Sequence, residues 1–142
     1  MSHESDPPPG FEPFDRSSPF LELLGKIWVS RDDPNPRFGI RVGEQHLNNK
    51  GTVHGGVVST LADIACGYTV AWSPEPPSSL VTIHLATEFL GSARLGEWLQ
   101  ATGTVLKLTR SVASSTATIE TDRGVVAHAT ALFHVPDGQR AV

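Results

Sequence analysis

The stretch GTVHGGVVSTLADIACGYTVAWSP, residues 51–74, decides the fold of this chain. Its apolar residues Val57, Leu61, Ile64 and Tyr68 recur at intervals of three and four positions, which is the period of an α-helix with one buried stripe. Two adjacent glycines leave the beginning of this helix bare, and a run of prolines ends it. The sequence therefore predicts one long and largely buried helix.

Asp63 is unusual in this helix, because it is the only acidic or basic residue of the stretch apart from the titratable His54. An unpaired carboxylate in a buried helix costs several kcal/mol unless it is hydrogen-bonded or lines a cavity. The residues three, four and seven positions away are mostly small: Gly56, Ser59, Thr60, Cys66, Gly67 and Val70. Another backbone, a partner subunit or a thin ligand could approach such a face closely, so Asp63 is a candidate functional residue.

The rest of the chain is predicted to form strands and one short helix, which indicates an α+β fold with an antiparallel sheet of five to six strands wrapped around one long central helix. The expected strands are Lys26–Arg31, Phe38–Val42, Leu80–Phe89, Trp98–Leu108, Val112–Thr121 and Val125–Val135, and the short helix is Pro19–Leu24. The last four strands are expected to follow one another as a meander. In the first of these four, alternation puts Val81, Ile83, Leu85 and Phe89 on one face and Thr82 on the other.

Composition indicates a single globular domain, because 39% of the 142 residues are hydrophobic and 18% are charged. Residues 1–17 are rich in Pro, Ser and acidic side chains and are expected to form a disordered N-terminal tail, which leaves residues 18–142 as the one domain. The net charge of −4 argues against nucleic-acid binding, which requires a basic face. A lone cysteine, Cys66, fits a cytoplasmic location, and no signal peptide or apolar run of ~18 residues predicts export or a membrane span.

Five features in a fixed order carry a resemblance to a known family. They are Asn48, the segment GTVHGG at 51–56, Asp63 on the following helix, Thr82 on the next strand, and ARLGE at 93–97. This pattern resembles the hotdog-fold acyl-CoA thioesterases, and in particular the phenylacetate-pathway (PaaI-like) subfamily, over roughly residues 39–135. The chain departs from the family pattern at Thr109, where a Gly is usual, and at Thr82, where relatives often carry Ser.

The helix start can support thioester hydrolysis without a metal or another cofactor, because its unpaired backbone N–H groups and the helix dipole favour a developing oxyanion. The resemblance implies that the catalytic residues are Asp63 as general base or nucleophile, the Gly55 N–H as the main oxyanion donor, Asn48 near the same carbonyl, Thr82 orienting the water, and His54 at the helix start. It also implies an acyl-CoA substrate and a homodimer or homotetramer. The active sites would lie at the dimer interface, with Asp63 supplied by the second subunit.

Four further residues are candidates for binding the substrate. Gly56 belongs to the bare helix start, and Arg94, Lys107 and Arg110 are candidates for the phosphates of CoA, because loops of the family often place basic side chains near the nucleotide. No metal site is expected, because the strand histidines lack close ligand spacing: His84, His128 and His134.

Several alternatives remain open for these residues and for the function. Asn48 could simply form an Asx-turn, Thr82 could be an ordinary strand residue, and His54 could fix its loop by a hydrogen bond. The chain could also be a non-catalytic acyl-CoA-binding hotdog module, or a hotdog hydratase or dehydratase. The combination of Asn48, Gly55, Asp63 and Thr82 favours hydrolysis, because a binding module needs no carboxylate that activates water.

Overall fold

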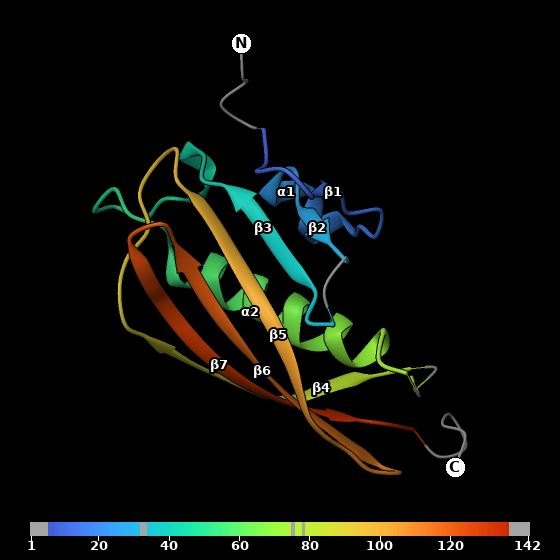
Figure 1. The fold of residues 1–142 in the computed structure, drawn as a ribbon. Coiled ribbons are helices and arrows are strands. Elements are labelled where there is room, and N and C mark those ends of the chain that lie inside the picture. Colours follow the sequence, from blue (N-terminus) through green and yellow to red (C-terminus); the bar gives the residue numbers. More distant parts are fainter. Residues whose placement is uncertain (1–5, 32–33, 75, 78, 137–142) are drawn as a thin grey trace.

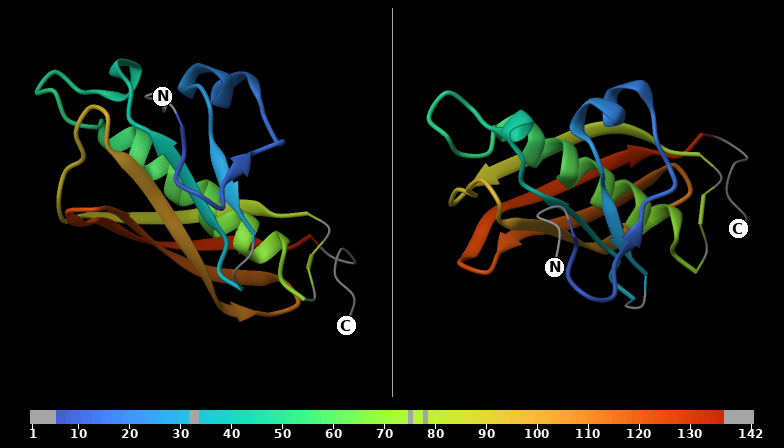
Figure 2. Two further views of the ribbon diagram at one scale, coloured as in Figure 1. Left: turned by 45° about the horizontal axis from the view of Figure 1, so that its top comes forward. Right: turned by 90° about the horizontal axis from the view of Figure 1, so that it is seen from above.

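Seven antiparallel strands form one sheet around the long helix α2 (Gly55–Ala71), and the short helix α1 (Pro19–Leu24) lies on the side of α2 away from the sheet (Figure 1, Figure 2). The computed structural model describes residues 6–31, 34–74, 76–77 and 79–136. The strands are β1 (Glu12–Pro13), β2 (Trp28–Ser30), β3 (Arg37–Arg41), β4 (Val81–Phe89), β5 (Trp98–Leu108), β6 (Val112–Thr121) and β7 (Gly124–His134), and a 3₁₀ helix spans Glu44–His46. The predicted α+β hotdog architecture is confirmed, with seven strands rather than five to six.

The strand order is β1-β2-β3-β5-β6-β7-β4, so the predicted meander of the last four strands is wrong. Tight hairpins pair β5 with β6 and β6 with β7, and β3 occupies the other side of β5. The strand β4 pairs with the outer side of β7. Within the described part of the chain the second side of β4 has no strand partner, so β4 forms one edge of the sheet.

The helix lies close to the sheet because both contact surfaces carry small side chains. The central strands present buried small residues to α2: Ala101, Gly103, Ala113, Ser115, Ala117, Ala127, Ala129 and Ala131. On the helix, Ala62, Ala65 and Thr69 are also buried. The Ser115 hydroxyl donates a hydrogen bond to the Cys66 carbonyl oxygen at 2.9 Å, which ties the middle of the sheet to the helix. The sheet can therefore curl tightly around α2.

Gly103 on β5 is a point of especially close contact with the helix. A Cβ atom added at Gly103 would overlap Thr69 Oγ1 and lie 2.8 Å from the Ala65 carbonyl oxygen. We expect Gly103→Val to lower the free energy of unfolding by about 3 kcal/mol, because neither backbone can yield without opening the core. Urea unfolding followed by circular dichroism measures this change.

The next residue on the same strand, Thr104, provides a matched control because its side chain is exposed. Thr104→Val should change the free energy of unfolding by less than about 0.5 kcal/mol. Equal losses in the two variants would contradict a special role for Gly103.

The register of β4 is irregular between Thr82 and His84. The side chains of Val81 and Ile83 are exposed, whereas Thr82 forms a hydrogen bond to α2 and Leu85 packs against the core. A bulge moves the following side chains to the other face of a strand. The predicted alternation, with Val81, Ile83 and Leu85 on one face and Thr82 on the other, is therefore wrong at the beginning of β4.

Residues 6–17, predicted to belong to a disordered tail, pack against the domain instead. Phe11 lies edge-on to Trp98 with ring centroids 4.9 Å apart, and Phe14 lies edge-on to Tyr68 at 5.0 Å. The two residues between them form β1, which pairs with β2, so the phenylalanines point to opposite faces of the sheet. The composition of this segment is poor in apolar residues, but two aromatic rings and the pairing of β1 with β2 attach it to the domain. Residues 1–5 lie outside the described residues.

No helix in the described ranges is long and apolar enough to cross a bilayer.

Candidate active site

The start of α2 is capped by the side chain of His54. The backbone of His54 is extended, and its imidazole Nδ1 accepts a hydrogen bond from the Gly56 N–H at 2.8 Å. In a neutral ring this places the proton on Nε2. This contact is the loop-fixing hydrogen bond that was the alternative role for His54. The Gly56 N–H, a predicted substrate-binding group, therefore already has a hydrogen-bond partner in His54.

The Gly55 N–H is the free donor at this helix start. Among the described residues it has no hydrogen-bond partner, and as the first residue of α2 it lies at the positive end of the helix dipole. The ring of Phe89 packs over this position, with its nearest atoms 3.3 Å from where a Cβ would stand. A carbonyl oxygen that reaches Gly55 would meet an N–H donor beside an aromatic wall.

Asn48 shapes the turn that leads into the helix. Its Oδ1 accepts hydrogen bonds from the N–H groups of Lys50 at 2.9 Å and Thr52 at 3.2 Å, and its Nδ2 donates to Thr52 Oγ1 at 3.0 Å. These contacts make the Asx-turn that was the structural alternative for this residue. The side-chain amide has a second hydrogen, so the predicted contact with a substrate carbonyl stays a prediction.

Asp63 and Thr82 are brought together by the bulge in β4. Thr82 Oγ1 donates a hydrogen bond to Asp63 Oδ1 at 3.0 Å. Asp63 is only partly buried, and no cation in the described part of the chain forms an ion pair with it. The carboxylate is therefore oriented by a neutral donor and keeps lone pairs for a water molecule.

Gly55 and Asp63 are separated along the helix in one chain. They are eight positions apart, which at 1.5 Å per residue corresponds to about 12 Å. A catalytic base must approach within about 3 Å of its proton, directly or through one water molecule. The free N–H and the carboxylate of a single chain therefore cannot act on the same carbonyl group.

Two hollows meet at Asp63 and Thr82, between α2 and β4. The first, with a volume of about 310 Å³, is mainly apolar and is lined by side chains that include Ile64, Tyr68, Ala71, Leu80 and Phe133. The second, of about 270 Å³, is lined also by Phe20, Ser59, Thr60 and Leu85. A larger hollow of about 570 Å³ lies against Thr69 and Trp72 at the C-terminal end of α2, but neither Asp63 nor Gly55 lines it. The candidate catalytic residues Asp63 and Thr82 therefore border the two smaller hollows and not the larger one.

Sequence reasoning did not identify Tyr68, Leu80 and Phe133 as residues of the site. They come from α2, the segment before β4, and β7, and no spacing along the chain joins them. The only sequence signal was for Tyr68, which belongs to the predicted buried stripe of the helix. Their meeting depends on the pairing of β4 with β7.

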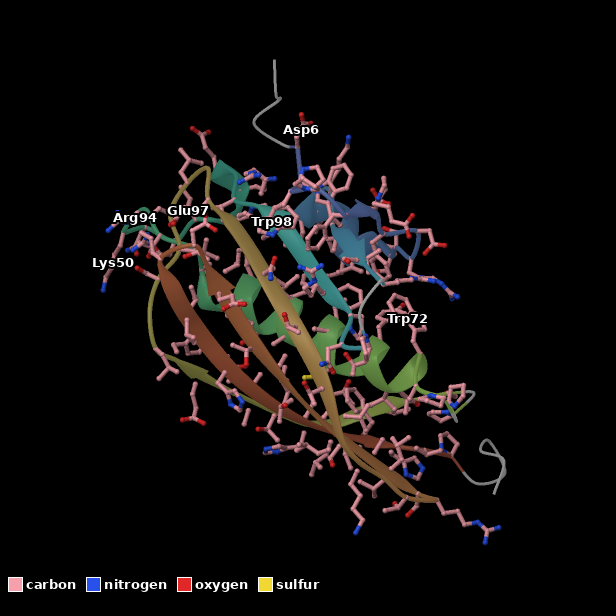
Figure 3. The ribbon with its side chains drawn as sticks, viewed as in Figure 1. Asp6, Lys50, Trp72, Arg94, Glu97 and Trp98 are labelled. Atoms are coloured by element: carbon pink, nitrogen blue, oxygen red, sulfur yellow. The ribbon has the colours of Figure 1, made fainter. Side chains whose placement is uncertain are left out.

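The three basic candidates for CoA phosphates do not lie together in one chain. Arg94 lies near Lys50 at one end of the molecule (Figure 3). Lys107 and Arg110 lie at the hairpin between β5 and β6, the opposite end of an 11-residue strand that rises about 3.3 Å per residue. All three predicted side chains are exposed. A single chain cannot use them on one nucleotide.

Glu97, in the ARLGE segment, holds a loop in place. Both of its carboxylate oxygens accept hydrogen bonds from Arg123 at 2.9 Å, and Oε1 also accepts one from the Arg94 N–H at 2.6 Å. The Arg123 hydrogen bonds hold the pKa of Glu97 below its usual value. Arg123 also donates to the Ser92 carbonyl oxygen at 3.0 Å, so this pair fixes the loop that follows β4.

Two other kinds of chemistry find no support in the described residues. Burial raises the pKa of the Cys66 thiol to about 11, so this cysteine is protonated at neutral pH and is a poor nucleophile. In the described ranges, no group of three or more His, Cys, Asp or Glu side chains could hold a metal ion.

Comparisons with known proteins connect this geometry to one family. The model of the thioesterase superfamily matches residues 50–128. A Pseudomonas aeruginosa protein with the name "Putative esterase PA0474" is 42% identical over 130 residues, which cover 91% of this chain and 97% of that protein. Human acyl-coenzyme A thioesterase 13 is 30% identical over 95 residues, which cover 66% of this chain and 67% of that protein.

The fold has close counterparts among solved structures. A mutant of the phenylacetic acid degradation protein PaaI from Thermus thermophilus aligns with a TM-score of 0.74 at 22% identity, over 84% of this chain and 100% of that one. At this identity the likeness concerns the fold.

Proposed function

The chain belongs to the thioesterase superfamily and is a thioester hydrolase with a hotdog fold, and we propose that it hydrolyses an acyl-CoA to the free acid and CoA. The family predicted from the order of Asn48, GTVHGG, Asp63, Thr82 and ARLGE is thereby confirmed. The name of the human relative supports CoA as the thiol of the substrate. We place the reaction in the cytoplasm, which agrees with a free, buried Cys66.

The hydrogen bond between Thr82 and Asp63 carries the proposal. It orients a carboxylate that has no cationic partner among the described residues and that borders both hollows. Such a carboxylate can accept a proton from a water molecule held beside it. A module that only binds acyl-CoA has no use for this arrangement.

In the proposed reaction, Asp63 takes a proton from water while the water oxygen attacks the thioester carbonyl carbon. The carbonyl oxygen becomes an oxyanion and accepts a hydrogen bond from the Gly55 N–H, which is typically worth about 3 to 4 kcal/mol of barrier. The free amide hydrogen of Asn48 is a candidate second donor. The intermediate then collapses, the C–S bond breaks, and the CoA thiolate leaves and takes up the proton.

A homodimer is the smallest assembly that can complete this site. Because about 12 Å separate Gly55 and Asp63 on one helix, one chain must supply the N–H and another the carboxylate. The unpaired edge of β4 and its exposed Val81 and Ile83 offer a surface for a second copy, whose β4 would extend the sheet. Each dimer then has two equivalent sites, and a tetramer would be a pair of such dimers.

A panel of acyl-CoAs incubated with the full-length protein tests the proposal. Free CoA, detected with a thiol reagent, should appear in proportion to enzyme and time. An enoyl- or hydroxyacyl-CoA that gains or loses water without release of thiol would indicate a hydratase or dehydratase. Saturable binding without any product would indicate a binding module, and either result would refute hydrolysis.

A further inference from the structure

The apolar hollow beside Asp63 forms a groove that follows the second half of α2. Apart from Asp63, no charged residue of the described chain lines it. From Asp63 to Ala71 the helix advances by eight residues, or about 12 Å. A groove whose one charged side chain among the described residues lies at one end suits a thioester whose carbonyl lies at Asp63 and whose acyl group lies along the helix, past Ile64 and Tyr68.

One wall of this groove is the ring of Tyr68, and other aromatic rings hold it in place. Phe14, Trp72 and Phe38 lie 5.0, 5.2 and 5.9 Å from Tyr68 between ring centroids. None of these three rings lines the groove. Trp72 stacks on Phe38 in turn, at 5.5 Å, so Tyr68 cannot turn toward them.

Phe14 is the one member of this cluster that comes from the N-terminal segment, residues 6–17. It reaches Tyr68 because β1 pairs with β2 and directs Phe14 toward the helix. Phe11, three residues earlier, packs on Trp98 instead. The segment 6–17 thus contributes Phe14, which packs behind the Tyr68 wall of the groove, and Phe11, which packs on Trp98 and forms no ring contact with Tyr68.

We propose that Phe14 of the N-terminal segment sets the width of this groove by holding the Tyr68 ring, so that the protein prefers a narrow acyl group to a wide one. This inference rests on the proposed hydrolysis of acyl-CoA. Phe14 is a positioning residue, since it acts through Tyr68. Loss of the Phe14 ring leaves space into which Tyr68 can turn, which widens the groove.

The test compares two substrates with the same number of acyl carbons and different widths, octanoyl-CoA and phenylacetyl-CoA. The unmodified protein should have the higher kcat/KM with octanoyl-CoA. Phe14→Ala should reduce this preference about ten-fold or more, because small differences of fit in an apolar pocket change kcat/KM by about 10- to 200-fold. Phe11→Ala is the matched control, and its preference should stay unchanged.

Binding gives a second readout that needs no turnover. Calorimetry with the non-hydrolysable thioethers S-octyl-CoA and S-phenethyl-CoA should show the same change in preference in Phe14→Ala and none in Phe11→Ala. Where Phe14→Ala does not fold, Phe14→Leu takes its place, and a smaller change in the same direction is expected. Folding is checked by circular dichroism.

Three results would overturn the inference: an unmodified protein that prefers phenylacetyl-CoA, a preference that does not change in the Phe14 variant, or an equal change in Phe11→Ala. Each of these leaves hydrolysis itself standing. Failure of the unmodified protein to release CoA from any acyl-CoA would instead refute the proposed function.

Discussion

Replacing Asp63 with asparagine is expected to lower kcat by about 10²- to 10⁴-fold. Asparagine has nearly the same shape as aspartate, and its side-chain oxygen can still accept the hydrogen bond that Thr82 donates at 3.0 Å. An amide cannot take a proton from water, so only the chemistry should be lost. The measurement is kcat with a saturating acyl-CoA that the unmodified protein hydrolyses, together with circular dichroism to show an intact fold.

Glu88 supplies the control for this prediction. It is an exposed carboxylate on β4, the strand that carries Thr82, and it lines neither hollow at Asp63. Glu88→Gln removes a negative charge near the site and should leave kcat within about two-fold of the unmodified value. If Asp63→Asn also kept its activity, Asp63 would have no part in the mechanism.

Replacing Gly55 with proline is expected to lower kcat by about 10²- to 10³-fold, because proline removes the N–H that would stabilise the oxyanion. The helix should survive, since Gly55 is its first residue, a position that suits proline. His54 already has the extended backbone that must precede proline, with φ −63° and ψ 136°. The added ring would press on Phe89, which is 54% exposed and has room to shift.

Gly55→Ala separates the loss of the N–H from simple crowding. Alanine keeps the N–H and adds a Cβ that also lies 3.3 Å from the Phe89 ring. Its kcat should remain within about ten-fold of the unmodified value. If alanine and proline reduced kcat equally, the effect would come from contact with Phe89 and the oxyanion role of Gly55 would be wrong.

Mixing these two inactive variants tests whether the site spans two chains. A dimer of one Asp63→Asn chain and one Gly55→Pro chain has one site in which an intact Asp63 faces an intact Gly55. Co-expression with random pairing should therefore restore about a quarter of the unmodified activity. A mixture no more active than its separate components would contradict a shared site, and a strictly monomeric protein in size-exclusion chromatography would do the same.

The helix and its carboxylate could be predicted from sequence because they depend on local signals. The spacing of Val57, Leu61 and Ile64 is set by the helical period, and all three residues are buried. Likewise, the turn residues around Gly51, which has φ +83°, follow from local backbone chemistry. The meeting of Asp63 and Thr82 was anticipated only through the family pattern, since simple alternation put Thr82 on the opposite face.

The errors share a different cause, because each depends on contacts between distant segments. The bulge in β4 puts Val81 and Ile83 on the face opposite to Leu85, and no residue type in that stretch signals an irregular register. Phe14 packs against Tyr68, more than fifty residues away in sequence, so the composition of residues 1–17 could not reveal that the segment is held. The pairing of β4 with β7 could not be predicted either, because these strands are distant in sequence and no local signal joins them.

The tight contact of Gly103 with Thr69 and Ala65 has a consequence for motion. Sliding or rolling of α2 over the strands would drive these backbones into one another, so the helix and the central strands should move as a rigid body. Gly55 and Asp63, which both belong to α2, should therefore keep constant positions relative to the central strands. Any movement that opens the site to a thioester should therefore occur in segments outside α2 and the central strands.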